Sequence, residues 1–105
     1  MLHTYNKLIR DKNIDIIASK GHRAVYRILD DKDYDIELDK KLVEEVNEYI
    51  ADHSIEEMAD ILEVINAILE YRGINMEDVE KSRIEKRNSK GDFSKKIFLE
   101  HVEEI

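Results

Sequence analysis

The chain has 105 residues, a formal net charge of −8, and 42% hydrophobic and 40% charged residues, a composition typical of one folded domain spanning residues 1–105. The acidic balance argues against a nucleic-acid or anionic-membrane partner, and no apolar run approaches the roughly 20 residues that cross a bilayer. Cysteine is absent, which excludes disulfides and thiolate metal sites, and the N-terminus lacks a secretory signal, so we expect a cytoplasmic protein.

The first part of the chain predicts one short helix and one extended stretch. Proline is absent and glycine occurs only at positions 21, 73 and 91, so each glycine is expected to end an element. A short helix is predicted near residues 10–20, stopped by Gly21. Residues 22–29, and residues 96–99 near the other end of the chain, are candidates for short strand-like segments.

The central part predicts two longer helices. From about 31 to 51, apolar residues recur at helical spacing on one face. Ser54 is expected to cap a second helix that runs to Arg72, with Gly73 just past its end. A connection this short makes the two helices antiparallel neighbours. With a further helix from roughly 75 to 88, the sequence predicts an all-α fold around an antiparallel helical hairpin.

The second helix of this hairpin is apolar over most of its surface. Its clearly solvated positions form one narrow stripe, namely Glu56, Glu63, Asn66 and Glu70. Such a helix must be buried on several sides, and a chain of this length offers few partners for it. We therefore expect oligomerisation to complete the core.

Acidic residues recur at three-residue spacing in both helices of the hairpin. The first helix carries E-E-x-x-E at 44–48 and the second carries E-x-x-D at 57–60. Residues three apart lie on one helix face, so Glu45 and Glu48 form one pair and Glu57 and Asp60 another. In an antiparallel hairpin the two pairs face each other. A hard divalent cation relieves the repulsion among four carboxylates, and oxygen ligands favour Mg²⁺.

The same residues also allow ordinary structural roles. Lys41 lies four residues before Glu45, a spacing typical of surface ion pairs on a helix. Residues 54–57 match a capping box, in which the Glu57 side chain turns back to the start of its helix. Spacing alone leaves the metal site and the solvated face both open.

Three blocks in order resemble the MazG-like, all-α nucleoside triphosphate pyrophosphohydrolases. The first is Tyr5-Asn6-Lys7-Leu8-Ile9-Arg10-Asp11-Lys12, which is similar to the opening of a small phosphoribosyl-ATP pyrophosphohydrolase-like subgroup. The second is the pair of acidic motifs at 44–48 and 57–60. The third is the basic tail at 85–97, which is similar to the Gly-Phe-containing ending of that subgroup.

The resemblance implies a chemistry and a set of ligands. It implies that Mg²⁺, or Mn²⁺ as a substitute, is held by Glu45, Glu48, Glu57 and Asp60, and that Glu44 is either an outer partner of these ligands or helps to orient the attacking water. It also implies hydrolysis of nucleoside triphosphates to monophosphate and pyrophosphate, associated with clearing of surplus or non-standard nucleotides, in a homodimer or homotetramer.

Two features depart from the family pattern. Eight residues separate Glu48 from Glu57, which is shorter than the family's usual interval and predicts a tight hairpin. Asp92 stands where a second glycine is expected, and its charge opposes phosphate binding.

Basic residues are the candidates for binding the substrate phosphates through charge-assisted hydrogen bonds. They are Arg10, Lys12, Arg83, Lys86, Arg87, Lys90, Lys95 and Lys96. Their other interpretation is ion pairing to the acidic middle of the chain, or plain solvation.

Two other functions fit the same residues. One is a phosphoribosyl-ATP pyrophosphohydrolase of histidine synthesis, with the same metal chemistry. The other is a non-catalytic helical interaction protein, whose carboxylates are a solvated face. The sequence does not identify the preferred base or sugar, or the number of metal ions.

Overall fold

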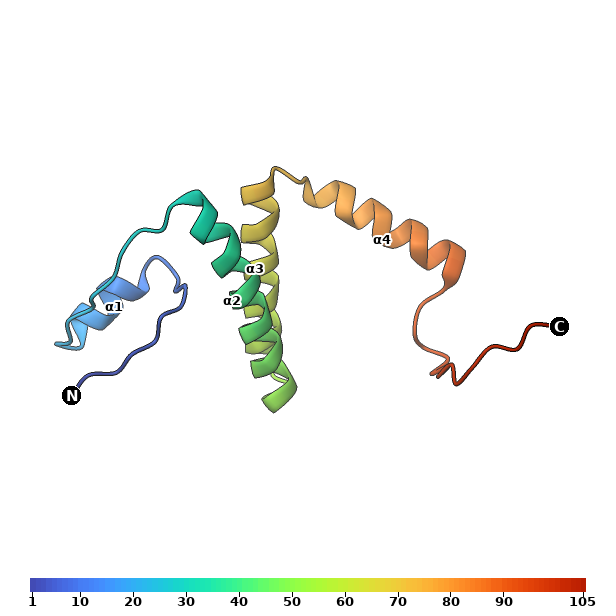
Figure 1. Ribbon diagram of the computed structural model, residues 1–105, viewed down its shortest axis with the longest axis horizontal. Coiled ribbons are helices and arrows are strands. Elements are labelled where there is room, and N and C mark those ends of the chain that lie inside the picture. The colour runs from blue at the N-terminus through green and yellow to red at the C-terminus, as the bar shows by residue number, and fades with distance from the viewer. The chain divides into compact units, whose positions relative to one another are not determined.

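The computed structural model describes residues 1–105, which form four helices and no strand (Figure 1). The helices are α1 (Asn13–Ser19), α2 (Asp31–Asp52), α3 (Ile55–Arg72) and α4 (Met76–Lys90). The predicted all-α class is therefore confirmed. The chain divides into two compact units, residues Met1–Gly73 and residues Ile74–Ile105. No helix combines the length and the hydropathy that a bilayer crossing requires.

Caps define both ends of α3 as the sequence predicts, and a side-chain cap also begins α2. Asp30 accepts a hydrogen bond from the backbone amide of Asp33 at 2.8 Å, and this begins α2. Ser54 Oγ accepts from the amide of Glu57 at 3.1 Å and begins α3. Gly73 ends α3 with φ of +66°, where its amide reaches carbonyls of the last turn. A left-handed C-cap favours glycine, because a Cβ is strained there.

The helices α2 and α3 pack antiparallel along their lengths and form the hairpin of the first unit (Figure 1). At the closed end His53 has φ of +54°, and its amide donates to the Tyr49 carbonyl at 2.7 Å. At the open end the Tyr71 hydroxyl donates to the Asp31 carbonyl at 3.1 Å, and Arg72 pairs with Asp35 at 2.9 Å. Contacts at both ends thus hold the register of the two helices.

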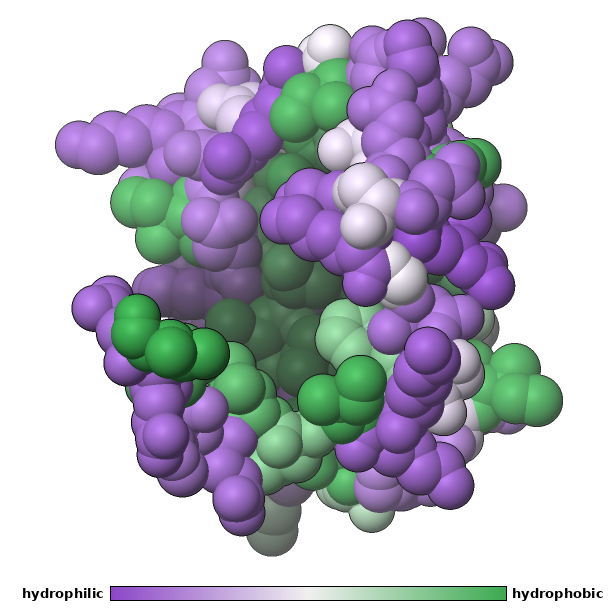
Figure 2. Space-filling model, turned by 90° about the vertical axis from the view of Figure 1, so that its right-hand side faces the viewer, coloured by the Kyte–Doolittle hydropathy of each residue, from purple (hydrophilic) through white to green (hydrophobic).

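Many apolar side chains of the hairpin remain partly accessible. Leu38 and Val64 are the only buried hydrophobic residues. Large apolar side chains on both helices are about half exposed or more, including Val43, Ile50 and Leu62. In the space-filling view, apolar side chains reach the surface among polar ones (Figure 2). The polar stripe predicted for α3 is exposed throughout, as expected.

Three predicted elements differ from the structure. Residues 22–29 and 96–99 contain no strand, because neither segment pairs with a partner strand that would accept its backbone hydrogen bonds. The first helix begins at Asn13 rather than near residue 10, and it is only seven residues long.

The second unit contains one helix followed by irregular chain. Asn75 accepts a hydrogen bond from the amide of Glu77 at 2.9 Å and begins α4, and Gly91 follows its last residue. The helix therefore lies close to the predicted range of 75–88. None of its residues is buried.

Candidate metal centre

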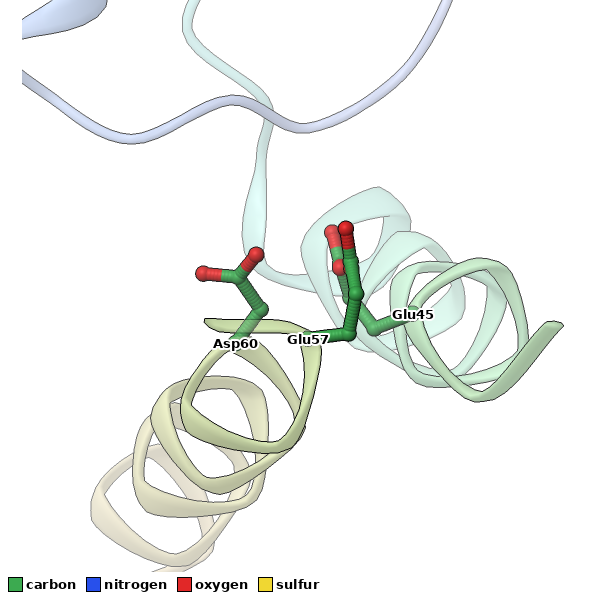
Figure 3. Close-up of side chains that lie close together, drawn as sticks. All are labelled: Glu45, Glu57 and Asp60. Atoms are coloured by element: carbon green, nitrogen blue, oxygen red, sulfur yellow. The ribbon is translucent and has the colours of Figure 1, made fainter. Parts of the chain in front are cut away.

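Three of the predicted acidic ligands lie together on one side of the hairpin. Glu45 comes from α2, while Glu57 and Asp60 come from successive turns of α3 (Figure 3). One carboxylate oxygen from each residue lies within 4.8 Å of the others. Glu45 is only 9% exposed, although it is charged. The antiparallel packing of α2 on α3 therefore brings together groups that are 12 to 15 residues apart in sequence.

Glu48, the fourth predicted ligand, does not belong to this group. It lies one turn nearer the closed end of the hairpin, and its side chain is exposed. Its charge still acts on the cluster, because it helps to raise the pKa of Glu57. The facing pairs predicted from spacing are thus replaced by a group of three carboxylates, with Glu48 at its edge.

The capping box allowed by the sequence is not formed. The Ser54 amide donates to Asp52 Oδ1 at 3.0 Å, so it is not bonded to the Glu57 side chain. Glu57 contributes only its backbone amide to the cap and directs its carboxylate into the cluster (Figure 3). Partial burial raises the pKa of Glu57, and the negative charges of Asp52, Asp60, Glu45 and Glu48 raise it further.

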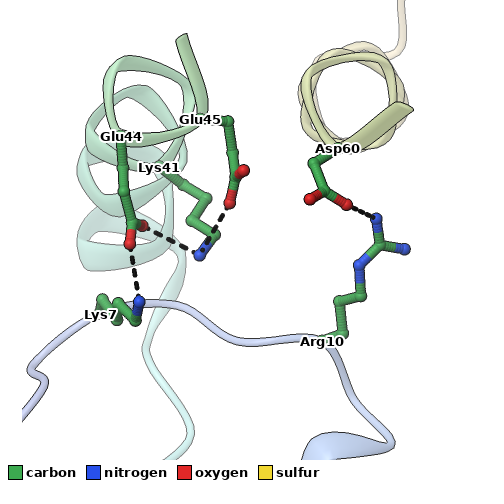
Figure 4. Close-up of polar contacts among 6 residues, drawn as sticks. All are labelled: Lys7, Arg10, Lys41, Glu44, Glu45 and Asp60. Atoms are coloured by element: carbon green, nitrogen blue, oxygen red, sulfur yellow. Dashed lines mark hydrogen bonds and ion pairs between the residues drawn. The ribbon is translucent and has the colours of Figure 1, made fainter. Parts of the chain in front are cut away.

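Lys41 contacts both Glu44 and Glu45, and Lys7 contacts Glu44 (Figure 4). Lys41 Nζ lies 2.9 Å from Glu44 and 3.3 Å from Glu45, and Lys7 Nζ lies 2.7 Å from Glu44. Burial works to raise the pKa of Glu44, but the hydrogen bonds from both lysines outweigh it and leave this pKa below its ordinary value. The pKa of Lys7 is raised in return by its hydrogen bond to Glu44.

Arg10 holds the opposite edge of the cluster. Its Nη2 atom donates to Asp60 Oδ1 at 2.7 Å (Figure 4). Lys7 and Arg10 both belong to the irregular segment before α1, which passes in front of the two helices on the side to which the carboxylates point (Figure 4). Glu57 forms no ion pair, so it is the one member of the group without its own cation.

The roles of Lys7 and Lys41 are not evident from the sequence. The spacing of Lys41 and Glu45 indicates an ion pair on the surface, whereas the Lys41 side chain is only 16% exposed. Lys7 belongs to the first block of the family resemblance, but no local pattern signals its contact with a residue 37 positions away. Only the packing of the hairpin and the N-terminal segment brings these groups together.

The remaining basic candidates lie apart from this cluster in sequence, and most of them form no ion pair. Arg83 pairs with Glu80 on the same helix, and Arg87 pairs with Asp92 at 3.5 Å. The other five candidates are exposed and form no ion pair, namely Lys12, Lys86, Lys90, Lys95 and Lys96. All of these except Lys12 belong to the second unit.

Comparison of the chain with models of protein families, with curated proteins and with solved structures found no match. The MazG-like assignment therefore rests on the three sequence blocks alone and stays a prediction.

Proposed function

We propose that this protein is a magnesium-dependent hydrolase that cuts nucleoside triphosphates to monophosphate and pyrophosphate. The observation that carries the proposal is the convergence of Glu45, Glu57 and Asp60 on one side of the hairpin. Three carboxylates at this spacing repel one another, and one of them, Glu57, has no cation of its own. A divalent cation at this point relieves that repulsion.

The donor set fits Mg²⁺. Carboxylate oxygens are the hard ligands that this ion prefers. An octahedral Mg²⁺ lies about 2.1 Å from each ligand oxygen, so two of its ligands are at most about 4.2 Å apart. The three oxygens lie within 4.8 Å of one another, slightly wider than this limit, so the side chains would have to draw closer to hold the ion. Mn²⁺ has the same preference for oxygen and is expected to substitute.

The proposed roles follow from the position of each residue. Glu45, Glu57 and Asp60 hold the cation, and Glu48 adds negative charge at the edge of the site. Bound Mg²⁺ supplies charge neutralisation for the phosphates and lowers the pKa of a coordinated water. Glu44, kept ionised by Lys7 and Lys41, accepts a hydrogen bond from the attacking water. The water oxygen bonds to the α-phosphorus and releases a proton to solvent, while the bond from the α-phosphorus to the α–β bridging oxygen breaks and that oxygen leaves with pyrophosphate.

We also propose that the enzyme is a cytoplasmic homodimer or homotetramer. The exposed apolar side chains of α2 and α3 support this assembly, because a hairpin with two buried apolar residues has little core of its own. Arg10, Lys12 and the basic residues between 83 and 96 are the candidates for holding phosphate groups.

A second candidate is the non-catalytic helical interaction protein. It is favoured by one observation, namely that Lys7, Lys41 and Arg10 already neutralise much of the acidic cluster. On this view the carboxylates organise the N-terminal segment against the hairpin and bind no metal.

The experiment is a product assay on the purified full chain. Protein and Mg²⁺ are incubated with a panel of ribo- and deoxyribonucleoside triphosphates, and with phosphoribosyl-ATP as a separate substrate. We expect pyrophosphate as the product, lost in Glu57→Gln and retained in Glu63→Gln, which changes an exposed carboxylate of the same helix. Turnover of phosphoribosyl-ATP alone assigns the reaction to histidine synthesis. Release of single phosphates, or no turnover on any substrate, contradicts the proposal.

A further inference from the structure

Arg10 is the most accessible of the three cations at the acidic cluster. Its side chain is 57% exposed and pairs with a carboxylate, Asp60, that is 37% exposed. Exposed ion pairs of this kind contribute little to stability. Arg10 also lies on irregular chain just before α1, where one turn hydrogen bond, from the Asn13 amide to the Arg10 carbonyl at 3.0 Å, holds its backbone and leaves the side chain free to turn. The pair is therefore easily broken.

Lys41 differs in each of these respects. It lies within α2, its side chain is 16% exposed, and it is held by both Glu44 and Glu45. Among the cations around the cluster, the side chain of Lys41 is thus fixed by its contacts, whereas the side chain of Arg10 is free to change its partner.

The charges around the cluster sum to a negative value, and Glu48 and Asp52 nearby add to it. Glu44, Glu45, Glu57 and Asp60 carry four negative charges, and Lys7, Lys41 and Arg10 return three positive ones. A divalent cation at Glu45, Glu57 and Asp60 places two positive charges beside the guanidinium of Arg10. It repels the guanidinium that lies 2.7 Å from Asp60 and attracts an anion in its place.

We propose that Arg10 exchanges partners, leaving Asp60 when the cluster takes up a divalent cation and binding a phosphate group of the substrate instead. This inference rests on the proposed function. A guanidinium suits both partners, because its planar set of donors matches a carboxylate and a phosphate equally well. Arg10 is paired with Asp60 before the exchange and with the phosphate after it, so its guanidinium has a negatively charged partner in both states.

The exchange makes cation binding and phosphate binding cooperative. Without an anion, the cation must break the Arg10–Asp60 pair and leave Arg10 unpaired. With an anion present, the same Arg10 gains a new partner. Because coupling between two ligands is reciprocal, pyrophosphate must tighten the binding of the cation by the same factor as the cation tightens the binding of pyrophosphate.

The test uses Arg10→Gln in the full chain, with Arg23→Gln as a matched loss of charge at an exposed residue of the same unit that forms no ion pair. Mg²⁺ alone and inorganic pyrophosphate with Mg²⁺ are the two probes, and calorimetry gives the affinity of each. Pyrophosphate is chosen because it belongs to every nucleoside triphosphate, whatever its base. The side-chain NMR signal of Arg10 in the wild type reports directly whether the residue leaves Asp60.

We expect Arg10→Gln to bind Mg²⁺ alone about two- to fivefold more tightly, because an exposed competing pair is lost. Binding of pyrophosphate with Mg²⁺ is expected to weaken about tenfold through the loss of a charge-assisted hydrogen bond. Arg23→Gln changes neither affinity, and the Arg10 signal of the wild type moves on addition of Mg²⁺.

Several results overturn the exchange. Weaker binding of both probes in Arg10→Gln makes Arg10 an organiser of the cluster, and unchanged binding of both leaves it without a role. A wild-type chain that binds no Mg²⁺ overturns this inference together with the proposed function. Opposite shifts in the two affinities without hydrolysis of any triphosphate support the exchange and overturn the hydrolase alone.

Discussion

The backbone amide of Ser54 donates a hydrogen bond to the Asp52 side chain at 3.0 Å, and this contact decides what Glu57 is able to do. In a capping box Glu57 would turn back to that same amide. Because Asp52 is already bonded to it, the Glu57 carboxylate lies beside Glu45 and Asp60 instead. The amide that a capping box would use is thus bonded to Asp52, and the Glu57 carboxylate is the third member of the acidic cluster.

Loss of the Ser54 hydroxyl should destabilise the hairpin. Ser54 Oγ accepts from the Glu57 amide at 3.1 Å, and removal of such a cap costs about 1 kcal/mol. We expect Ser54→Ala to lower the Tm by a few degrees, measured by circular dichroism during heating. Ser54→Thr keeps an acceptor and should restore most of the loss. An unchanged Tm in Ser54→Ala would show that the cap contributes nothing to the fold.

Mg²⁺ should raise the Tm of the wild type. A ligand that binds only the folded chain stabilises it by about 2.7 kcal/mol at a hundred times its Kd. We expect this rise to disappear in Glu57→Gln and Asp60→Asn, and to persist in Glu63→Gln. Differential scanning calorimetry with and without Mg²⁺ makes the comparison. An equal rise in all four proteins would place the ion elsewhere.

A variant of Glu48 distinguishes the three-ligand site that the hairpin geometry supports from the four-ligand site that the family resemblance implies. The resemblance makes Glu48 a ligand equal to Glu57, whereas its side chain lies outside the group of three carboxylates. From the geometry we expect Glu48→Gln to weaken Mg²⁺ binding by less than Glu57→Gln does, as measured by calorimetric titration. Equal losses in the two variants would favour the four-ligand site instead.

The raised pKa of Glu57 predicts that ionisation of this carboxyl destabilises the folded chain in the absence of added metal, to a degree that depends on pH. Just above pH 4.5, the ordinary pKa of a glutamate, Glu57 still holds its proton in the folded chain but has released it in the unfolded chain. The free energy of unfolding therefore falls as the pH rises through this interval, and the cost is fully present at neutral pH.

Removal of this carboxylate should therefore stabilise the chain. We expect Glu57→Gln to have a higher Tm than the wild type at pH 7 without metal, and the difference to close well below pH 4.5. Thermal melts across this pH range give the answer. A lower Tm for the variant at pH 7 would mean that the ionised Glu57 has a stabilising partner.

The exposed apolar side chains of the hairpin predict self-association. Leu62 on α3 is 57% exposed, and we expect Leu62→Glu to dissociate the oligomer, because a charge buried in an apolar interface is costly. Sedimentation equilibrium should give a multiple of 12.4 kDa for the wild type and a smaller mass for the variant. Glu63→Gln, next to it on the polar stripe, should leave the mass unchanged. A monomeric wild type contradicts the prediction.

Local patterns in the sequence were sufficient for the helices of the hairpin. The side chain of Ser54 and the backbone freedom of Gly73 act within a few residues of where they stand, so both ends of α3 can be predicted without a fold. The helix α2 follows from the helical spacing of its apolar residues. The prediction of strand-like segments was wrong, because a strand depends on contacts that are distant in the sequence. A strand needs a distant partner for its hydrogen bonds, and composition alone does not show that none is present.

Local patterns in the sequence predicted only part of the acidic cluster. Helical periodicity puts Glu57 and Asp60 on one face, and antiparallel packing puts Glu45 opposite them, so these three residues follow from the sequence. The displacement of Glu48 depends on side-chain positions that periodicity does not determine. The contacts of Lys7 with Glu44 and of Arg10 with Asp60 join residues 37 and 50 positions apart. Only tertiary structure decides such pairs, because charge attraction has no sequence signature until the chain brings the two groups within a few ångströms of each other.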